Sequence, residues 1–439
     1  MRDYLSALER EGEVRRVRRE VDPRHELAAV IQAWQNESEA ALLFERVRGN
    51  AMPVAANLYG SRRRLARLIG ADDGNFCRRW VALTAGLDEI VATEPGAAGP
   101  LVSGRIGELP AITYYERDAG PYLTSAVFLA REPESGVPNL SFHRAQLVSD
   151  HELRVRLGPS HDLAKSQATA EAQGQALEAA LLIGAPPEVF LAAAASLPLE
   201  DDEMRAAAAI NGGPIAVRPC RTIDLEVPLA SEIVIEGRFL PGQRRPEGPF
   251  AEFMGYYVPV GDNAVFEVRN VSWRERATFQ ALLCGSADDY RLLETAVAAR
   301  IYRHLTESAK LPGIIDVSCQ PTLLNTVVQI DKQSPDHPRE VALAAFAAHP
   351  DYSKMCVVVD RDVDLYNMSQ AMWAYLTRGR ADTRAFIIEN VPGFYRDEHR
   401  DHWGRLAIDA TKPWGREAEF ERTRIPGVER VRLSDYLSE

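Results

Sequence analysis

The sequence lacks a long apolar segment and any pairing pattern of cysteines. No apolar run reaches the roughly 18 residues of a membrane-spanning helix, so we expect no membrane span. The N-terminus, Met1-Arg2-Asp3-Tyr4, begins a charged amphipathic pattern without the apolar core of a signal peptide. The five cysteines are Cys77, Cys220, Cys284, Cys319 and Cys356. They form no C-x-x-C pair, which is typical of reduced thiols in a cytoplasmic protein rather than of a disulfide framework or a zinc site.

The sequence also lacks an excess of basic residues. Its 51 lysines and arginines are outnumbered by 63 aspartates and glutamates, and the formal net charge is -12. Because nucleic-acid phosphates are bound by basic surfaces, this balance argues against nucleic acid as a partner. A small anionic ligand held by a few local arginines is compatible with it.

Several motifs of nucleotide binding and hydrolysis are missing as well. The sequence has no G-x-G-x-x-G after a predicted strand, no P-loop, no G-x-S-x-G and no H-E-x-x-H. Nucleoside triphosphates, dinucleotides in a Rossmann site, serine hydrolysis and zinc peptidase chemistry are therefore poorly supported.

What the sequence does contain predicts a mixed α/β fold in three parts. Of its 439 residues, 46% are hydrophobic and 26% are charged, as in an ordinary soluble protein of two or three domains. Residues 1–105 are predicted to form a small α+β unit. Residues 106–305 are rich in strands with a few inserted helices, which indicates a barrel, and residues 306–439 alternate strands and helices as an α/β domain does.

The stretch Pro246–Tyr257 carries the most specific local pattern. Glu247 and Glu252 lie five residues apart, which would place them roughly 140° apart on a helix and on opposite faces of a strand. Gly248 and Pro249 encode a bend between them, since glycine permits unusual φ and ψ and proline fixes its own φ. The bend would let both carboxylates point at one small apolar space, where a raised pKa keeps a carboxyl group protonated for proton transfer. The alternative is a surface turn with two solvated glutamates.

Polar residues upstream of this stretch suggest a second group. Asn139 and Arg144 also lie five residues apart, His161 is expected in the first turn of a helix, and Glu203 belongs to an acidic run that opens another helix. Asn139, His161 and Glu203 form a mixed oxygen and nitrogen donor set that suits a hard divalent cation such as Mn²⁺ or Mg²⁺. A solvated histidine and carboxylates that favour the helix dipole are the alternatives, because the sequence does not show that these segments meet.

Two further segments allow more than one interpretation. Val189–Ala194 is apolar and strand-like, although a helix is compatible with it. The acidic run Asp360–Asp364 follows a predicted strand but lacks the glycine and the distal glutamate of a calcium loop. We therefore set calcium aside and consider a subunit contact there.

Several motifs in a consistent order make the chain resemble the UbiD family of prenylated-FMN-dependent decarboxylases over nearly its whole length. The segments that carry the resemblance are Leu5–Glu13, Ala41–Val47, Asn57–Arg62, the N-x-x-x-x-R motif Asn139–Arg144, Glu247–Glu252 in place of the family's E-G-P-F-G-E, Val358–Asp364 and Ile408–Pro413. The resemblance implies an N-terminal α+β domain, a central split β-barrel that binds the flavin, and a C-terminal α/β oligomerisation domain.

The resemblance also implies roles for individual residues. The catalytic triad would be Arg144, Glu247 and Glu252. The ligands of a divalent cation that holds the cofactor's phosphate, with K⁺ or Na⁺ nearby, would be Asn139, His161 and Glu203. The cofactor-binding residues would be Asn139, Ser141, Phe142, His143, Arg144, His161, Glu203 and Arg405.

The chain departs from the family pattern near the expected substrate. Ser141-Phe142-His143 stands where many members have a glycine and a tyrosine, and Ala251 replaces the glycine before the second glutamate. Family members usually carry a phosphate-contacting lysine just before the I-D-A-T block, where this chain has Gly404-Arg405. A guanidinium can grip phosphate with two hydrogen bonds, so Arg405 is the expected substitute.

The expected activity is the reversible, non-oxidative decarboxylation of an aromatic, heteroaromatic or α,β-unsaturated carboxylic acid. The expected cofactors are prenylated FMN, supplied by a prenylated-flavin synthase, with Mn²⁺ or Mg²⁺ and K⁺ or Na⁺. We expect a cytoplasmic homodimer or homohexamer with no nucleic-acid or membrane partner. The alternatives are a non-catalytic flavin-binding scaffold on the same fold and an FMN reductase on a split barrel.

Overall fold

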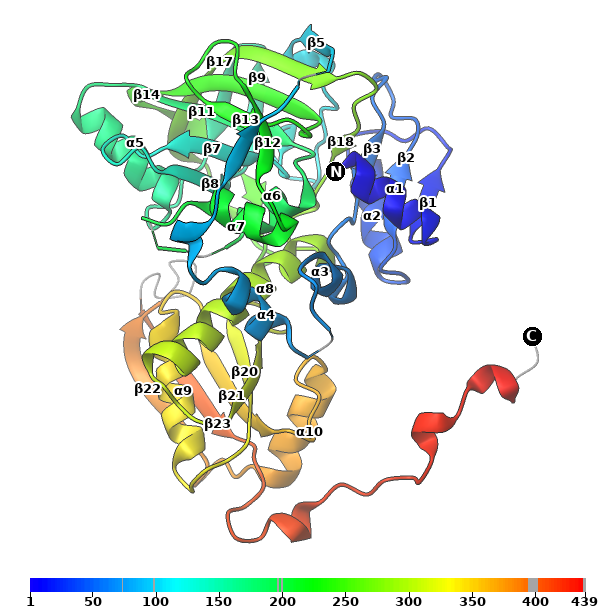
Figure 1. The fold of residues 1–439 in the computed structure, drawn as a ribbon, viewed down its shortest axis with the longest axis vertical. Coiled ribbons are helices and arrows are strands. Elements are labelled where there is room, and N and C mark those ends of the chain that lie inside the picture. Colours follow the sequence, from blue (N-terminus) through cyan, green and yellow to red (C-terminus); the bar gives the residue numbers. More distant parts are fainter. Residues whose placement is uncertain (73, 98, 196, 199, 394–401, 437–439) are drawn as a thin grey trace. The chain divides into compact units, whose positions relative to one another are not determined.

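The computed structural model describes residues 1–72, 74–97, 99–195, 197–198, 200–393 and 402–436 (Figure 1). The chain forms two compact units, Met1–Arg300 and Ile301–Glu439. The first unit therefore contains both the predicted N-terminal part and the predicted barrel. Among the described residues, no helix combines the length and the apolar character that crossing a membrane requires.

The N-terminal part of the first unit is a small sheet with helices, as the sequence predicts. Its strands, in sheet order, are β1 (Val14–Val17), β2 (Ala41–Phe44), β3 (Val54–Ala56) and β18 (Phe279–Gln280). Its helices are α1 (Arg2–Arg10), α2 (Glu26–Gln35), α3 (Arg62–Leu68) and α4 (Phe76–Leu83). Every residue of β2 and β3 is buried, which explains their continuous apolar sequences. Strand β18 lies far along the chain, after the Glu247–Glu252 bend, and pairs with β3 in this sheet.

A nine-stranded antiparallel sheet forms the centre of the first unit. Its strands, in sheet order, are β6 (Tyr122–Leu123), β9 (Ala145–Ser149), β10 (Glu152–Val155), β17 (Gly261–Arg274), β14 (Ile233–Glu247), β11 (Leu177–Ile183), β7 (Val127–Arg131) and β8 (Pro138–Phe142), with β5 (Leu101–Gly104) on β17. Phe128 of β7 lies 6.3 Å from Phe266 of β17, ring centre to ring centre. In a flat sheet three strand spacings would separate these residues by about 14 Å. The sheet is therefore strongly curled around an apolar core, which confirms the barrel-like prediction.

Short elements surround the curled sheet. The helices are α5 (Asp162–Ala172), α6 (Pro187–Ala192) and α7 (Glu203–Asn211), with short 3₁₀ turns at Leu87–Glu89 and Ile106–Glu108. The remaining strands are β4 (Thr93–Pro95), β12 (Ile215–Pro219), β13 (Glu226–Pro228), β15 (Phe250–Ala251) and β16 (Tyr257–Val258). The strand-like interpretation of Val189–Ala194 was wrong, because Pro187 starts a helix there as a first-turn proline can. An apolar run this short does not distinguish a buried helix from a buried strand.

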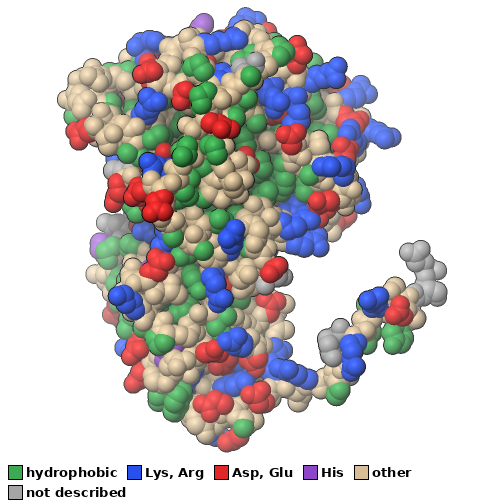
Figure 2. Space-filling view, viewed as in Figure 1, with side chains coloured by type: hydrophobic (Ala, Val, Ile, Leu, Met, Phe, Trp, Pro, Cys, Tyr) green, Lys and Arg blue, Asp and Glu red, His purple; other side chains and the backbone are tan. Residues whose placement is uncertain are grey.

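The second unit is an α/β domain, as predicted. Its five-stranded sheet has the order β19 (Ile314–Ser318), β20 (Asn325–Ile330), β21 (Met355–Asp360), β23 (His402–Asp409) and β22 (Ala385–Pro392). The three central strands are parallel and the two edge strands are antiparallel to them. The helices are α8 (Ala287–Arg303), which leads into the unit, α9 (His337–Ala348) and α10 (Met368–Arg378), with single turns at His304–Ser308, Glu417–Phe420, Val428–Arg430 and Leu433–Asp435. Acidic and basic side chains are interspersed over the face shown in Figure 2.

Candidate active site

The two glutamates of the bend meet at one guanidinium. Strand β14 ends at Glu247, and Gly248 follows with a φ of +94°, a conformation that L side chains rarely adopt. The Gly248–Pro249 peptide bond is cis, and β15 then leads directly to Glu252. Both carboxylates form hydrogen bonds with Arg144. The predicted bend, with both acids directed at one space, is confirmed.

Arg144 lies in the short connection between β8 and β9. Its Nε and Nη2 donate to the two carboxylate oxygens of Glu247, each over 3.0 Å, and its Nη1 donates to Oε1 of Glu252 over 3.1 Å. Glu247 also accepts hydrogen bonds from the Tyr122 hydroxyl and the Asn263 amide, both at 2.9 Å. Four donors therefore fix the Glu247 carboxylate, and Glu247 in turn fixes the direction of the guanidinium.

This cluster is nearly closed to water. The side chains of Arg144, Glu247 and Glu252 are 8%, 0% and 16% exposed, respectively. The Phe250 ring lies 4.6 Å from the Arg144 guanidinium carbon. Burial opposes the charged form of Arg144, but the hydrogen bonds and negative charge of Glu247 outweigh it and raise the pKa of Arg144. The site thus presents a permanent cation beside two carboxyl groups, an arrangement that can bind a carboxylate and move a proton.

Asp118 holds the strand between the two glutamates. Its carboxylate accepts hydrogen bonds from the backbone N–H groups of Ala251 and Tyr115, both at 2.9 Å. Burial raises the pKa of Asp118, and the backbone hydrogen bonds and Arg144 oppose that rise. Sequence reasoning missed Asp118, Tyr122 and Asn263, because each is polar in an unremarkable context and only the fold brings it to the bend.

A second polar cluster forms on β8, next to Arg144. The Asn139 amide donates to Glu203 over 3.4 Å, and the backbone N–H of Leu140 donates to the other oxygen of Glu203 over 3.1 Å. The Ser141 hydroxyl donates to Oδ1 of the Asn139 side chain over 3.1 Å and lies 3.0 Å from Nε2 of His143. Glu203 begins α7, so the fold brings residues 60 positions apart in sequence into one cluster.

His161 completes this neighbourhood. It stands directly before α5, and its ring lies 5.3 Å from the ring of His143. Phe142 points elsewhere, with its ring against Phe190 at 4.7 Å. The structure thus brings together Asn139, Ser141, His143, His161 and Glu203, all of which the sequence singled out.

The charge of Glu203 lacks a basic partner among the described residues. No lysine or arginine in that part of the chain forms an ion pair with it, although the residue is only 4% exposed. Burial raises the pKa of Glu203 to about 8. Burial also lowers the pKa of His143 well below its ordinary value.

The cluster contains donor types that hard divalent cations accept. The described residues contain no group of three or more His, Cys, Asp and Glu side chains placed to hold a metal, but the predicted set includes the amide oxygen of Asn139. A buried carboxylate without a cation, an amide oxygen and an imidazole are the donor types that Mn²⁺ or Mg²⁺ accept. A bound cation would also favour the charged form of Glu203, which burial opposes.

The hydrogen bonds of the Arg405 guanidinium are made within the second unit. Arg405 belongs to β23 of the second unit, and its guanidinium donates to the backbone carbonyls of Phe346, Pro350 and Pro392 over 2.6, 2.8 and 3.1 Å. These three bonds give Arg405 a structural role inside its own unit. Its predicted contact with a phosphate stays a prediction that these contacts do not favour.

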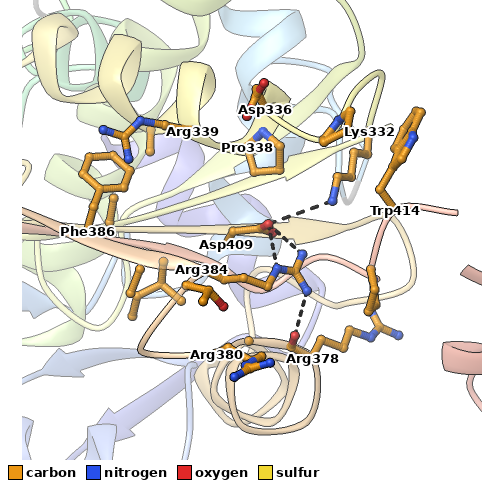
Figure 3. Close-up of a pocket in the computed structure, with 18 of the residues that line it drawn as sticks. Lys332, Asp336, Pro338, Arg339, Arg378, Arg380, Arg384, Phe386, Asp409 and Trp414 are labelled. Atoms are coloured by element: carbon orange, nitrogen blue, oxygen red, sulfur yellow. Dashed lines mark hydrogen bonds and ion pairs between the residues drawn. The ribbon is translucent and has the colours of Figure 1, made fainter. Parts of the chain in front are cut away.

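The second unit has a pocket of about 560 Å³ near the ends of β20 and β23 (Figure 3). Lys332, Arg384 and Asp409 point toward one another in it, with Arg384 Nε 3.0 Å and Lys332 Nζ 3.9 Å from Oδ2 of Asp409. Arg378 pairs with carboxylates on the run Asp360–Asp364, at 2.9 and 2.7 Å. Two acids of that run are thus engaged within the unit, and the subunit contact considered for it stays a prediction.

Comparisons with known proteins cover nearly the whole chain. Three family models match, described as the N-terminal, Rift-related and C-terminal domains of 3-octaprenyl-4-hydroxybenzoate carboxy-lyase, over residues 5–84, 102–287 and 291–410. The anhydromevalonate phosphate decarboxylase of Methanothermobacter thermautotrophicus is 31% identical over 96% of this chain and 99% of its own length.

Solved structures agree. The UbiD-class enzyme HmfF from Pelotomaculum thermopropionicum, in complex with FMN, superimposes with a TM-score of 0.93, 32% identity and 99% coverage of both chains. An evolved dimeric form of that enzyme in complex with prFMN has a TM-score of 0.89, again with 32% identity and 99% coverage of both chains.

Proposed function

Because the chain belongs to the UbiD family and is a carboxy-lyase, we propose that it catalyses the reversible, non-oxidative decarboxylation of an aromatic, heteroaromatic or α,β-unsaturated carboxylic acid with prenylated FMN. One observation carries the proposal: Arg144, Glu247 and Glu252 meet in a single buried ionic cluster. A protein with a purely structural role has no need for a cation and two acids at one solvent-excluded point.

Arg144 would bind the substrate's carboxylate. Its described hydrogen bonds to Glu247 and Glu252 use three of its five N–H donors, which leaves two for a substrate. The two parallel bonds to Glu247 set the plane of the guanidinium, so an incoming carboxylate is bound in one orientation. The pairing also keeps the positive charge at every pH at which the protein is folded.

Glu252 would supply the proton that replaces CO₂. The net reaction takes one carboxylate and one proton and releases one C–H product and one CO₂. When bound, the prenylated flavin supplies an electrophilic centre that accepts the electron pair left on the substrate carbon. Glu252 is the partly exposed acid of the pair, at 16%, whereas Glu247 is fully buried and held by four donors. Glu252 is therefore the acid that delivers the proton to the substrate carbon, and Glu247 orients Arg144.

The cation and the cofactor would be held beside this triad. Asn139, His161 and Glu203 would bind Mn²⁺ or Mg²⁺, which would in turn hold the flavin phosphate, with K⁺ or Na⁺ nearby. The complexes of HmfF with FMN and prFMN support a flavin of this type. Ser141, Phe142 and His143 would line the flavin site, and a prenylated-flavin synthase would supply the cofactor. Arg405 is the weakest member of the proposed set, given its three carbonyl partners.

The assembly proposed is a homodimer or homohexamer formed through the C-terminal α/β part, residues 306–439. The evolved dimeric form of HmfF supports this part of the proposal. Size-exclusion chromatography with light scattering at micromolar concentration is the measurement, and a monomer would contradict this part of the proposal.

The function is tested on the purified holoprotein. The absorbance spectrum and the mass of the released flavin identify the cofactor, and a panel of aromatic, heteroaromatic and unsaturated acids is screened for CO₂ release. Prenylated FMN with turnover of at least one acid supports the decarboxylase. Prenylated FMN without turnover of any acid indicates the scaffold, and ordinary FMN reduced by a nicotinamide cofactor indicates a reductase.

A further inference from the structure

The loop that carries Glu252 is the turn of a short hairpin. Residues Glu252–Tyr256, called here the Glu252 loop, join β15 to β16, and each of these strands has only two residues. The loop closes on itself through two backbone hydrogen bonds, from Glu252 N to Tyr256 O and from Gly255 N to Glu252 O, of 3.1 and 2.9 Å. So short a hairpin is marginal alone, and an acid placed on it needs outside support to hold one position.

The start of α8 supplies a contact to this loop. The Tyr290 hydroxyl donates a hydrogen bond to the backbone carbonyl of Phe253, the residue next to Glu252. The Tyr290 and Phe253 rings also meet edge to face, with centres 6.4 Å apart. Burial raises the pKa of Tyr290 to about 12, so its hydroxyl keeps its proton and remains a donor over the range in which enzymes work.

Gly285 brings the same segment close to the loop. Its φ is +74°, and a Cβ there would lie 3.4 Å from the Phe253 carbonyl oxygen and 3.5 Å from that of Glu252. A side chain at residue 285 would be strained by this φ, and its Cβ would be in ordinary van der Waals contact with the two loop carbonyls. The segment that leads into α8 therefore lies directly beside the Glu252 loop.

The start of α8 is itself anchored. The Asp289 carboxylate accepts from Gly285 N over 2.8 Å, and the Asp288 carboxylate accepts from the backbone N–H of Tyr59 over 2.6 Å. The Tyr115 hydroxyl donates to the carbonyl of Cys284 over 2.7 Å. One bond within the stretch and two bonds to separate segments hold it in place, so it forms a fixed base for the loop.

We propose that Tyr290 is a positioning residue for catalysis, which holds the Glu252 loop through the Phe253 carbonyl so that the Glu252 carboxyl group stays in line with the carbon it protonates. This inference rests on the proposed role of Glu252 as the acid. Tyr290 acts on the backbone of the neighbouring residue and not on Arg144, so it governs the proton-transfer step and leaves capture of the substrate carboxylate unchanged. Proton transfer is sensitive to displacements of about 1 Å.

The test is Tyr290→Phe in the holoenzyme, with Tyr256→Phe as the matched control. The first variant keeps the edge-to-face ring contact and removes the hydroxyl. Tyr256 lies on the same loop, but its side chain is 73% exposed, so removing its hydroxyl alters no buried contact. For Tyr290→Phe we expect kcat to fall about tenfold or more, on the scale of positioned acid catalysis, with KM and flavin content within about twofold of wild type. For Tyr256→Phe we expect all three to remain within about twofold.

Deuterium incorporation separates positioning from a general loss of structure. In D₂O, wash-in of deuterium at the product C–H should slow in Tyr290→Phe by the same factor as kcat, because both report the proton delivered by Glu252. Wild-type kcat in Tyr290→Phe would overturn the inference, and so would a rise in KM at unchanged kcat, which would indicate a substrate contact instead.

A second variant tests the contact between the loop and the start of α8 without removing the Tyr290 hydroxyl. Gly285→Ala leaves the Tyr290 hydroxyl in place but strains the backbone that leads into α8, because residue 285 has a φ of +74°. It should therefore also lower kcat with KM nearly unchanged. If it keeps wild-type kcat while folded, the loop does not depend on α8 and the inference fails. Failure of the proposed function would look different, since the wild-type holoenzyme itself would then release no CO₂ from any acid in the panel.

Discussion

Arg144 and Glu247 face each other through two parallel hydrogen bonds, from Nε to Oε1 and from Nη2 to Oε2, each 3.0 Å long. Both side chains are almost fully buried, at 8% and 0% exposure. The geometry of such a pair fixes the relative orientation of the two groups, because the planar guanidinium of arginine matches the two carboxylate oxygens. The pair sets the plane in which any further carboxylate can approach Arg144.

Arg144→Lys should therefore impair activity although it keeps the charge. An ammonium group cannot make both bonds to Glu247 while also reaching Glu252 and a substrate, so the substrate carboxylate loses its fixed orientation. We expect kcat/KM to fall on the order of 10²-fold, the typical effect of misplacing a reacting group by about 1 Å.

Arg238→Lys is the matched control for this change. Arg238 pairs with Glu267 at 2.8 Å on the neighbouring strand, but both side chains are about one third exposed. Its substitution should leave kcat/KM within about twofold. Equal losses in the two variants would show that the effect is one of general stability and not of substrate orientation.

The bend that carries the triad acids could be predicted because its cause is local. Gly248 and Pro249 stand between the two glutamates, and the backbone turns there in the way that these two residue types permit. The same holds for the helix that begins at Glu203, where Asp202 caps the first turn through Met204 N.

The partners of the triad could not be predicted, because they come from distant parts of the chain. Tyr122 is 125 residues away from Glu247, and Asn263 reaches it only through the pairing of β14 with β17. No local pattern distinguishes this tyrosine from others in the sequence. The helix at Pro187–Ala192 was missed although its signal is local. An apolar run in a buried segment carries no periodicity that distinguishes a helix from a strand.

His161→Ala tests the proposed cation site. With one of three protein ligands removed, metal affinity should fall at least 10–100-fold, the range seen when even an outer partner of a metal ligand is lost. Flavin content should fall in parallel, because the cation is proposed to hold the flavin phosphate. Metal analysis and flavin absorbance on the same sample provide the measurement. His151→Ala, an exposed histidine on the turn between β9 and β10, is the control. Full occupancy of both metal and flavin in His161→Ala would remove His161 from the site.

Asp289→Asn should change how stability depends on pH. Burial raises the pKa of Asp289 to about 6, whereas an aspartate in an unfolded chain has a pKa near 3.9. The folded protein thus binds this proton more tightly than the unfolded chain does. The contribution of the protonated Asp289 to folding stability is therefore complete below about pH 4 and is lost as the pH rises through about 6.

The asparagine variant has no such loss and keeps an oxygen that can accept from Gly285 N. Relative to wild type it should gain stability between pH 4 and pH 7, by up to about 3 kcal/mol for a shift of about two units. Denaturant unfolding at several pH values measures this gain. The exposed Asp262→Asn is the control, and a gain of equal size there would assign the effect to net charge.

Glu252→Gln provides the sharpest test of the mechanism. Glutamine keeps the size of the side chain and an oxygen that can accept from Arg144 Nη1, but it has no proton to deliver. The proposed cation site uses other residues, so metal and prenylated FMN should bind as in wild type. Decarboxylation should fall by about 10²–10⁴-fold or more, and exchange of the product's proton with D₂O should fall in parallel. Glu267→Gln, on β17 in an ion pair whose side chains are about one third exposed, is the control for loss of one glutamate charge. Near wild-type turnover and exchange with a full complement of cofactor would exclude Glu252 as the acid, and Glu247 would then be the residue to replace.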